Sequence, residues 1–172
     1  GQQADDPLLI ALAHWCLGIV LFGLGKFTQA RFHLEEVVTF YQPQQHHRAF
    51  MILRGIDAGL SSLAYLALCL WCLGYHEQAL KKSREALDMA HAIDHSFSLA
   101  DVLRYGCCEL HKLRRDAPSL KFYSDELIQV AQEKHFPAWR ATGISCLGEA
   151  YILLDQLEEG ILLIRDSVEE NL

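Results

Sequence analysis

Proline is scarce in this sequence, and no stretch shows the alternation of apolar and polar residues that marks a half-buried β-strand. With four prolines in 172 residues, long segments lack the residue that most strongly disrupts a helix interior. Apolar side chains recur instead at helical spacing, which predicts an all-α fold. There is no run of the about 18 apolar residues that a membrane-spanning helix needs, and no signal-peptide pattern. We therefore expect a cytoplasmic protein with no membrane partner.

Positive charge is also in short supply, since 15 Lys and Arg residues stand against 22 Asp and Glu residues and the net charge is −7. Non-specific nucleic-acid binding depends on a basic surface, so nucleic acid is not an expected partner. Residues 1–172, of which 51% are hydrophobic, suffice for one domain with a substantial core. The segment from Gly1 to Pro7 resembles the cut end of a larger protein, so we expect a fragment.

The sequence motifs of common enzymes are missing as well. We find no glycine-rich phosphate-binding loop, no G-x-S-x-G and no H-E-x-x-H. Nor is there a pair of metal-binding carboxylates of the kind that a nucleotide cyclase uses. We therefore expect neither catalytic residues nor a cofactor.

The six cysteines lie within apolar helical patterns, which favours reduced thiols over a disulfide framework. Cys69 and Cys72 form a C-x-x-C, a spacing that can indicate redox or metal chemistry. No proline separates them and no second C-x-x-C accompanies them, so packing is the favoured interpretation. The adjacent Cys107 and Cys108 are interpreted in the same way.

The nine histidines raise the question of a metal site. His46 and His47 are adjacent, and His91 and His95 are four residues apart, a spacing that places two ligands on one helix face. No glutamate completes a zinc motif, and a histidine near a helix C-terminus also suits the helix dipole. We expect no metal.

The stretch from Leu12 to Pro43 predicts two helices joined by a tight turn at Gly25. Comparable turns at positions 25, 74, 114 and 155 are 49, 40 and 41 residues apart. Small residues recur seven before and five after each turn, and we expect them to mark helix contacts: Gly18, Ala67, Cys107 and Gly148, then Ala30, Ala79, Ser119 and Gly160. The predicted helical repeats cover residues 7–43, 57–95, 96–135 and 137–172, and the connection 42–59 is expected to contain a helical turn or to pack on the core.

This pattern resembles the tetratricopeptide repeat, which places small and aromatic residues at fixed positions over two helices. The first repeat matches it at Leu17, Gly18, Gly25, Phe27, Ala30 and, displaced by one, Pro43; the second at Leu66, Gly74, Ala79 and Ala86; and the fourth at Leu147, Gly148 and Tyr151. The third repeat departs from it, with Arg114 and Ser119 at consensus positions. A period near 40 exceeds the usual length of about 34 residues, so longer helices are expected.

Nearly the whole sequence, and residues 64–100 most of all, is similar to the repeat regions of large bacterial signalling proteins. In those proteins a cyclase or kinase domain and an ATPase precede the helical array. Related arrays occur in ATP-dependent transcriptional activators. This resemblance implies an α-α superhelix that binds a protein or peptide, including the ATPase or cyclase of its own parent chain.

In such arrays the first helix of each pair lines a concave groove. The residues predicted to line it are Trp15, Ile19, Phe22, Leu68, Trp71, Arg104, His111, Lys112 and Glu149. An equal alternative is that the aromatic members simply fill the core. The leading hypothesis for function is a non-enzymatic protein-binding module. A small-ligand sensor is the second hypothesis, and self-association through apolar end surfaces is the third.

Overall fold

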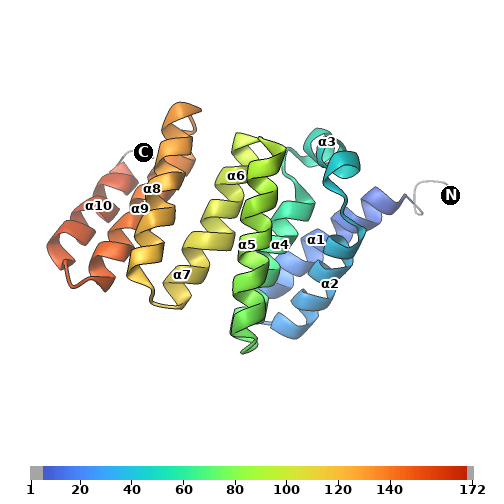
Figure 1. The fold of residues 1–172 in the computed structure, drawn as a ribbon, viewed down its shortest axis with the longest axis horizontal. Helices are drawn as coiled ribbons and strands as arrows, with labels where there is room; N and C mark the ends of the chain where they lie inside the picture. The colour runs from blue at the N-terminus through green and yellow to red at the C-terminus, as the bar shows by residue number, and fades with distance from the viewer. Residues whose placement is uncertain (1–5, 170–172) are drawn as a thin grey trace. The chain divides into compact units, whose positions relative to one another are not determined.

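The computed structural model describes residues 6–169, and these are helical almost throughout, with no strand among them (Figure 1). The predicted all-α fold is confirmed. The elements are α1 (Pro7–Gly23), α2 (Phe27–Phe40), α3 (Pro43–Arg54), α4 (Ala58–Cys72), α5 (His76–Ile93), α6 (Ser96–Val102), the π-helical η1 (Leu103–Cys108), α7 (Glu109–Leu113), α8 (Ala117–Glu133), α9 (Pro137–Leu153) and α10 (Leu157–Glu169). The expected cut end at Gly1 and the last residues of the fourth repeat lie outside the described part.

Aspartates begin three of these helices. The side chain of Asp6 accepts a hydrogen bond from the backbone N–H of Leu8, and Asp116 accepts one from Ser119. Asp57 accepts from two backbone N–H groups at the start of α4. Each carboxylate satisfies donors that the first turn of a helix leaves unpaired.

The connection between the first two repeats forms the helix α3, a longer element than the single turn that the sequence predicts. Pro43 stands in its first turn, where the missing N–H costs nothing, and Gly55 ends it in the left-handed conformation with φ of 69°. Phe50 on α3 is fully buried, and α3 packs on α4. The extra residues of this connection therefore contribute to the core.

The predicted helix contacts are confirmed in the first and fourth hairpins. A Cβ atom added to Gly18 would lie 2.7 Å from the Leu34 side chain and 3.6 Å from the carbonyl oxygen of Ala30. A Cβ atom on Gly148 would lie 2.7 Å from the carbonyl oxygen of Gly160. In both hairpins the helices approach so closely because the side chains at the contact are small.

The third hairpin corrects the sequence alignment by one residue. Arg115, rather than Arg114, adopts the left-handed conformation that Gly25 adopts in the first turn. The equivalent contact positions are therefore Cys108 and Leu120, both fully buried, and not Cys107 and Ser119. The π-helical turn η1 lies in the first helix of this hairpin, and a π-turn accommodates an additional residue that no count of α-helical turns anticipates.

The chain divides between Ser98 and Leu99 into two compact units, three residues from the predicted boundary between the second and third repeats. In unit 1, which ends at Ser98, α4 packs against α1, α2, α3 and α5. In unit 2, which begins at Leu99, η1 and α7 pack on α8, α8 packs on α9, and α9 packs on α10. Each unit contains two of the four predicted repeats.

Among the described residues, no single helix has both the length and the apolar composition needed to cross a membrane. The pair α3 and α4 meets those criteria only when the two helices are counted together, and they are bent by 95° relative to one another.

Candidate functional site

The groove residues predicted in unit 1 fall into two groups, one buried and one half-buried. Leu68 on α4 is 0% exposed, and Trp15 on α1 is 8% exposed, so both belong to the core of the unit. The guanidinium of Arg54 lies 5.9 Å from the centre of the Trp15 ring and covers it further. For Leu68 and Trp15 the structure therefore favours the core alternative over a binding surface.

Ile19, Phe22 and Trp71 are half-buried. The ring of Phe22 meets that of Tyr65 edge to face, with centroids 5.5 Å apart, and the ring of Trp71 lies 4.2 Å from that of His76. Such ring contacts fix the aromatic side chains within unit 1 and leave only part of each accessible. The predicted apolar end of the groove is thus largely packed against its own unit.

Unit 2 brings three of the predicted residues together. Arg104 on η1, Lys112 on α7 and Glu149 on α9 are all half-buried, and Glu109 on α7 joins them. Arg104 Nη1 lies 2.5 Å from one carboxylate oxygen of Glu109, and Lys112 Nζ lies 3.0 Å from the other. Lys112 Nζ also lies 3.3 Å from Glu149 Oε2. The result is a row of alternating positive and negative groups, which we call the charge row: Arg104, Glu109, Lys112 and Glu149.

Sequence reasoning missed Glu109. The available signal was its spacing of three from Lys112, since side chains at that spacing are neighbours on a helix. Its link to Arg104 runs across five residues and follows from the π-helical turn, which no sequence pattern indicated.

The members of the charge row hold one another in their ionised forms. Burial tends to raise the pKa of Glu109, but hydrogen bonds from Arg104 and Lys112 outweigh it, and the pKa is lowered. Burial likewise tends to lower the pKa of Lys112, and Glu109 and Glu149 raise it overall. The pKa of Arg104 is also raised, with burial opposed by Cys146 and Glu109. The charges therefore persist at neutral pH even though the side chains are partly removed from water.

A cavity of about 360 Å³ lies beside the charge row. Arg104 and Glu149 line it together with Thr142, Ser145 and Cys146 from α9. It therefore offers a guanidinium, a carboxylate, hydroxyls and a thiol within a single recess of unit 2.

His111, the remaining predicted groove residue, is placed elsewhere. It is buried, its Nδ1 lies 2.8 Å from Arg114 Nη1, and its ring lies 5.2 Å from that of Tyr123. Burial, followed by the charge of Arg114, lowers its pKa, although Asp116 acts in the opposite direction. His111 thus stabilises the turn between α7 and α8 and lies within the packing of that turn.

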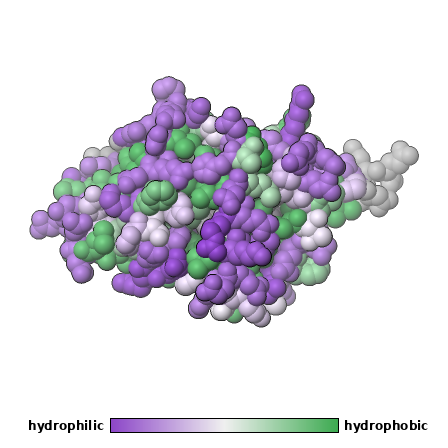
Figure 2. All heavy atoms as spheres, in the orientation of Figure 1, coloured by the Kyte–Doolittle hydropathy of each residue, from purple (hydrophilic) through white to green (hydrophobic). Residues whose placement is uncertain are grey.

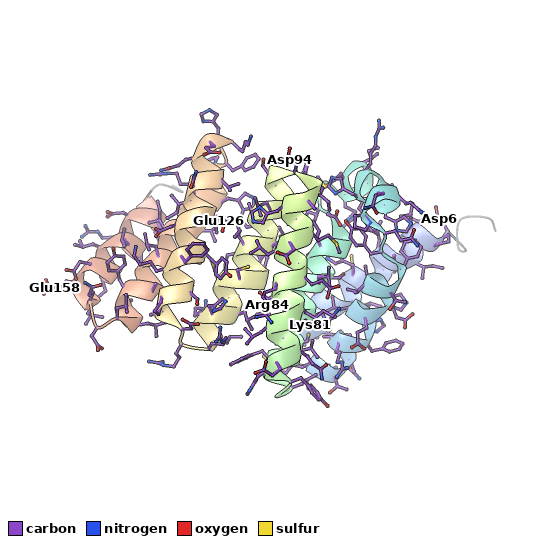
Figure 3. All side chains as sticks on the ribbon, viewed as in Figure 1. Asp6, Lys81, Arg84, Asp94, Glu126 and Glu158 are labelled. Carbon is purple, nitrogen blue, oxygen red and sulfur yellow. The ribbon has the colours of Figure 1, made fainter. Side chains whose placement is uncertain are left out.

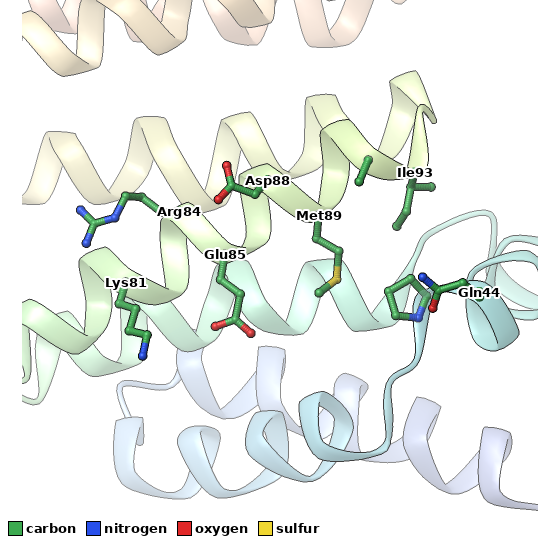
Figure 4. A pocket seen from close by; sticks show the side chains of 9 residues that line it. Gln44, Lys81, Arg84, Glu85, Asp88, Met89 and Ile93 are labelled. Atoms are coloured by element: carbon green, nitrogen blue, oxygen red, sulfur yellow. The ribbon is translucent and has the colours of Figure 1, made fainter.

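Unit 1 contains a larger cavity of about 800 Å³ that sequence reasoning did not anticipate (Figure 4). Lys81, Glu85 and Met89 line it from α5, and Pro43 and Gln44, at the start of α3, line the end nearer to Met89. The outer face of α5 is mostly hydrophilic in Figure 2, and Lys81 and Arg84 extend from it in Figure 3. The cavity thus combines the charged Lys81 with the apolar Met89 and Ile93 further along α5.

Other histidines make structural contacts in unit 1. The ring of His46 stacks on Phe40 with centroids 4.3 Å apart, and His47 Nδ1 lies 2.5 Å from Asp57 Oδ2. Across residues 6–169, no group of three or more His, Cys, Asp or Glu side chains is arranged to hold a metal ion.

In comparison with known proteins, no family model matches this chain and no curated protein matches it. Functional inference therefore depends on the geometry of the two units.

Proposed function

We propose that the chain is a non-catalytic interaction module that binds a peptide, a helix or a neighbouring domain, and that the charge row of unit 2 is its main recognition surface. The observation that carries this proposal is that Arg104 and Glu149 line the cavity, half-buried, and that ion pairs with Glu109 and Lys112 hold them in place. Partly desolvated arginines of this kind are frequent anchors of protein–protein interfaces.

The alternation of charge favours a protein ligand over a simple anion. Each cation of the row already faces a carboxylate, so the row has no large excess of positive charge for phosphate. A protein segment that carries both signs of charge and a few hydroxyls complements such a surface, and complementarity of this kind gives specificity.

The proposal extends to the parent protein. We propose a tetratricopeptide-like solenoid in a cytoplasmic bacterial signalling protein, where the module regulates an attached ATPase or cyclase or serves a transcriptional activator. The recurrence of left-handed turns at Gly25, Gly74, Arg115 and Asp155 supports a repeat origin. Six free cysteines suit a reducing compartment.

The test is selection of ligands from a library of random peptides displayed on phage, followed by affinity measurement with fluorescence anisotropy. Arg104→Glu is expected to weaken binding of the selected peptides at least about tenfold, since it reverses a partly buried charge.

Lys134→Glu is the matched control, because it makes the same reversal of charge on an exposed side chain at the end of α8. It should leave affinity unchanged, and circular dichroism should show equal helicity in all variants. Peptides that bind Arg104→Glu as tightly as the wild type would contradict the proposal.

The second candidate function is a small-ligand sensor, which the 800 Å³ cavity of unit 1 favours. That volume is typical of small-molecule sites, and Met89 and Ile93 provide apolar lining beside charged groups. A thermal-shift screen against metabolites would identify a ligand that raises the melting temperature. Met89→Trp should abolish such a shift by filling the cavity, whereas Leu53→Trp on the exposed face of α3 should not.

A further inference from the structure

Two of the six cysteines, far apart in sequence, meet inside unit 2. Cys108 closes the π-helical η1 and Cys146 lies in the middle of α9. Both are buried in one small cluster with Leu120 and Ala150, and the two thiols share a hydrogen bond. The Cys108 sulfur also lies 3.8 Å from the Ser124 hydroxyl oxygen.

The surroundings of the two thiols are unequal. Hydrogen bonding with the Cys108 thiol acts to lower the pKa of Cys146, and the charges of Arg104 and Lys112 act in the same direction, whereas the Glu149 carboxylate acts to raise it. As a result the pKa of Cys146 is lowered even though burial acts to raise it. The pKa of Cys108 is raised, first by its hydrogen bond to Cys146 and then by burial. An acidic thiol beside a thiol that remains protonated is the arrangement of a nucleophile and its resolving partner.

Cys146 is also within reach of small molecules from solvent. It lines the 360 Å³ cavity beside the charge row, together with Arg104 and Glu149. Cys108 has no such access, because its side chain is fully buried and no cavity of unit 2 described above includes it. An oxidant that enters the cavity therefore meets Cys146 first.

We propose that Cys146 and Cys108 form a redox modification site, at which a hydroperoxide oxidises Cys146 and Cys108 then closes a disulfide between α9 and η1. The thiolate of Cys146 attacks one oxygen of hydrogen peroxide, the O–O bond breaks, and hydroxide leaves, so that the sulfur becomes a sulfenic acid. Cys108 loses its proton to that hydroxide, giving water, and its sulfur attacks the Cys146 sulfur. The sulfenic oxygen leaves as hydroxide and combines with the proton that Cys146 released on forming its thiolate, which gives a second water. Two thiols and one peroxide thus give one disulfide and two waters.

Unit 1 contains an internal comparison. Cys69 and Cys72 lie one turn apart on α4, and burial raises the pKa of both. For Cys69 the pKa is about 12, and the charge of Arg31, which acts to lower it, does not reverse the shift. Their thiolate fraction at neutral pH is small, so the C-x-x-C that the sequence draws attention to should be the less reactive pair.

The test uses the whole chain, treated with graded hydrogen peroxide and then blocked with an alkylating agent before peptide mass spectrometry. We expect a disulfide between the peptides of Cys108 and Cys146, formed at least about tenfold faster than oxidation of Cys69 or Cys72, and reversed by dithiothreitol. Recovery of both cysteines as alkylated thiols under conditions that oxidise Cys69 would overturn the proposal. Pairing of Cys146 with Cys107 would overturn it as well.

Variants separate the two roles and guard against a folding defect. Cys108→Ala should trap the sulfenic acid on Cys146, detected as a dimedone adduct that the wild type does not accumulate. Cys146→Ala should leave Cys108 reduced, and Arg104→Gln should slow the oxidation of Cys146 several-fold by removing a nearby positive charge. Cys69→Ala should leave the rate unchanged. Equal oxidation rates in Arg104→Gln and the wild type would refute the assignment of Cys146 as the activated thiol.

Discussion

Single residues decide how closely paired helices approach, and three glycines of this chain provide a graded test. A methyl group at Gly148 would meet the backbone oxygen of Gly160 at 2.7 Å, and backbone cannot rotate away. At Gly18 the nearest atoms belong to the Leu34 side chain, which can adjust, and at Gly23 there is nothing within 4 Å. We expect Gly148→Ala to destabilise the fold by about 1–3 kcal/mol and Gly18→Ala by less.

Gly23→Ala serves as the control for this series, because alanine favours the helix by up to about 1 kcal/mol where space is free. Urea denaturation followed by circular dichroism would measure the three free energies of unfolding. A Gly148→Ala variant as stable as the wild type would show that α9 and α10 do not meet as described.

Glu109 provides a prediction about the stability of the fold at low pH. Its pKa is lowered in the folded state from an ordinary value of 4.5, so its contribution to stability is complete above that pH and is lost as the pH falls through the lowered value. Glu109→Gln should therefore lower the urea midpoint at pH 7 and reduce the further loss between pH 7 and about pH 3.

Glu133→Gln is the control for the acid experiment, since Glu133 is exposed at the end of α8. It should show the same acid dependence as the wild type. If Glu109→Gln loses as much stability toward low pH as the wild type does, the ion pairs of Glu109 do not stabilise the folded state.

The sequence identified the face of each helix that turns inward but not the depth of each side chain. Leu68 and Trp15 share a face with the half-buried Trp71 and Ile19 by register, yet only the packing of neighbouring helices decides which of them water reaches. The charge row was predictable in part, because Arg104, Lys112 and Glu149 follow from register, whereas the role of Glu109 depends on the path of the π-helical turn.

At the scale of elements, the turns between helices have a common geometry that can be tested. Arg115 has φ of 55° and Arg114, one residue earlier, has φ of −73°. A non-glycine residue in the left-handed region costs about 1–2 kcal/mol, so Arg115→Gly should stabilise the chain by up to about 1 kcal/mol after the entropy of glycine is allowed for.

Arg114→Gly is the paired variant and should destabilise the fold. It places glycine at the end of a helix with right-handed geometry and removes the ion pair with Asp116, whose charged atoms lie 3.1 Å apart. Thermal denaturation of both variants would distinguish the two positions. If Arg114→Gly were instead more stable than Arg115→Gly, the left-handed turn residue would be at position 114, as the sequence predicts.

Helix ends were the part of the fold most open to prediction. Asp57 and Asp116 begin helices, and Gly25 and Gly74 end them, through local chemistry that a sequence displays directly. The π-helical turn could not be predicted, because no residue type is specific for it and it forms only where neighbouring helices favour one wider turn. The one-residue displacement of the predicted contacts in the third hairpin follows from the left-handed turn residue, which is Arg115 and not Arg114.

At the scale of the whole molecule, the division at Ser98 means that each unit buries its own core, α4 in the first and the pairing of α8 with α9 in the second. A helix at the edge of a unit then packs on other helices through one face only. The outward face of α1 is apolar and carries no Asp, Glu, Lys or Arg between Pro7 and Gly25. Its exposed residues recur at alternating spacings of three and four along one stripe: Ile10, Ala13, Leu17, Val20 and Leu24.

Such a stripe is the pattern by which two helices pack along a seam, so we expect the chain to self-associate through α1. Val20 and Leu24 are 58% and 64% exposed, and their burial against a second copy would favour the dimer. Sedimentation at a series of concentrations should show a mass that rises with concentration, and Leu17→Lys combined with Val20→Lys should abolish the rise by placing two charges in the seam. The control replaces Ile52 and Leu53 by lysine, since these two residues are also apolar and exposed but lie on α3. Because that pair lies outside the stripe, its replacement by lysine should leave the association intact, and a monomer mass for the wild type at every concentration would exclude the seam.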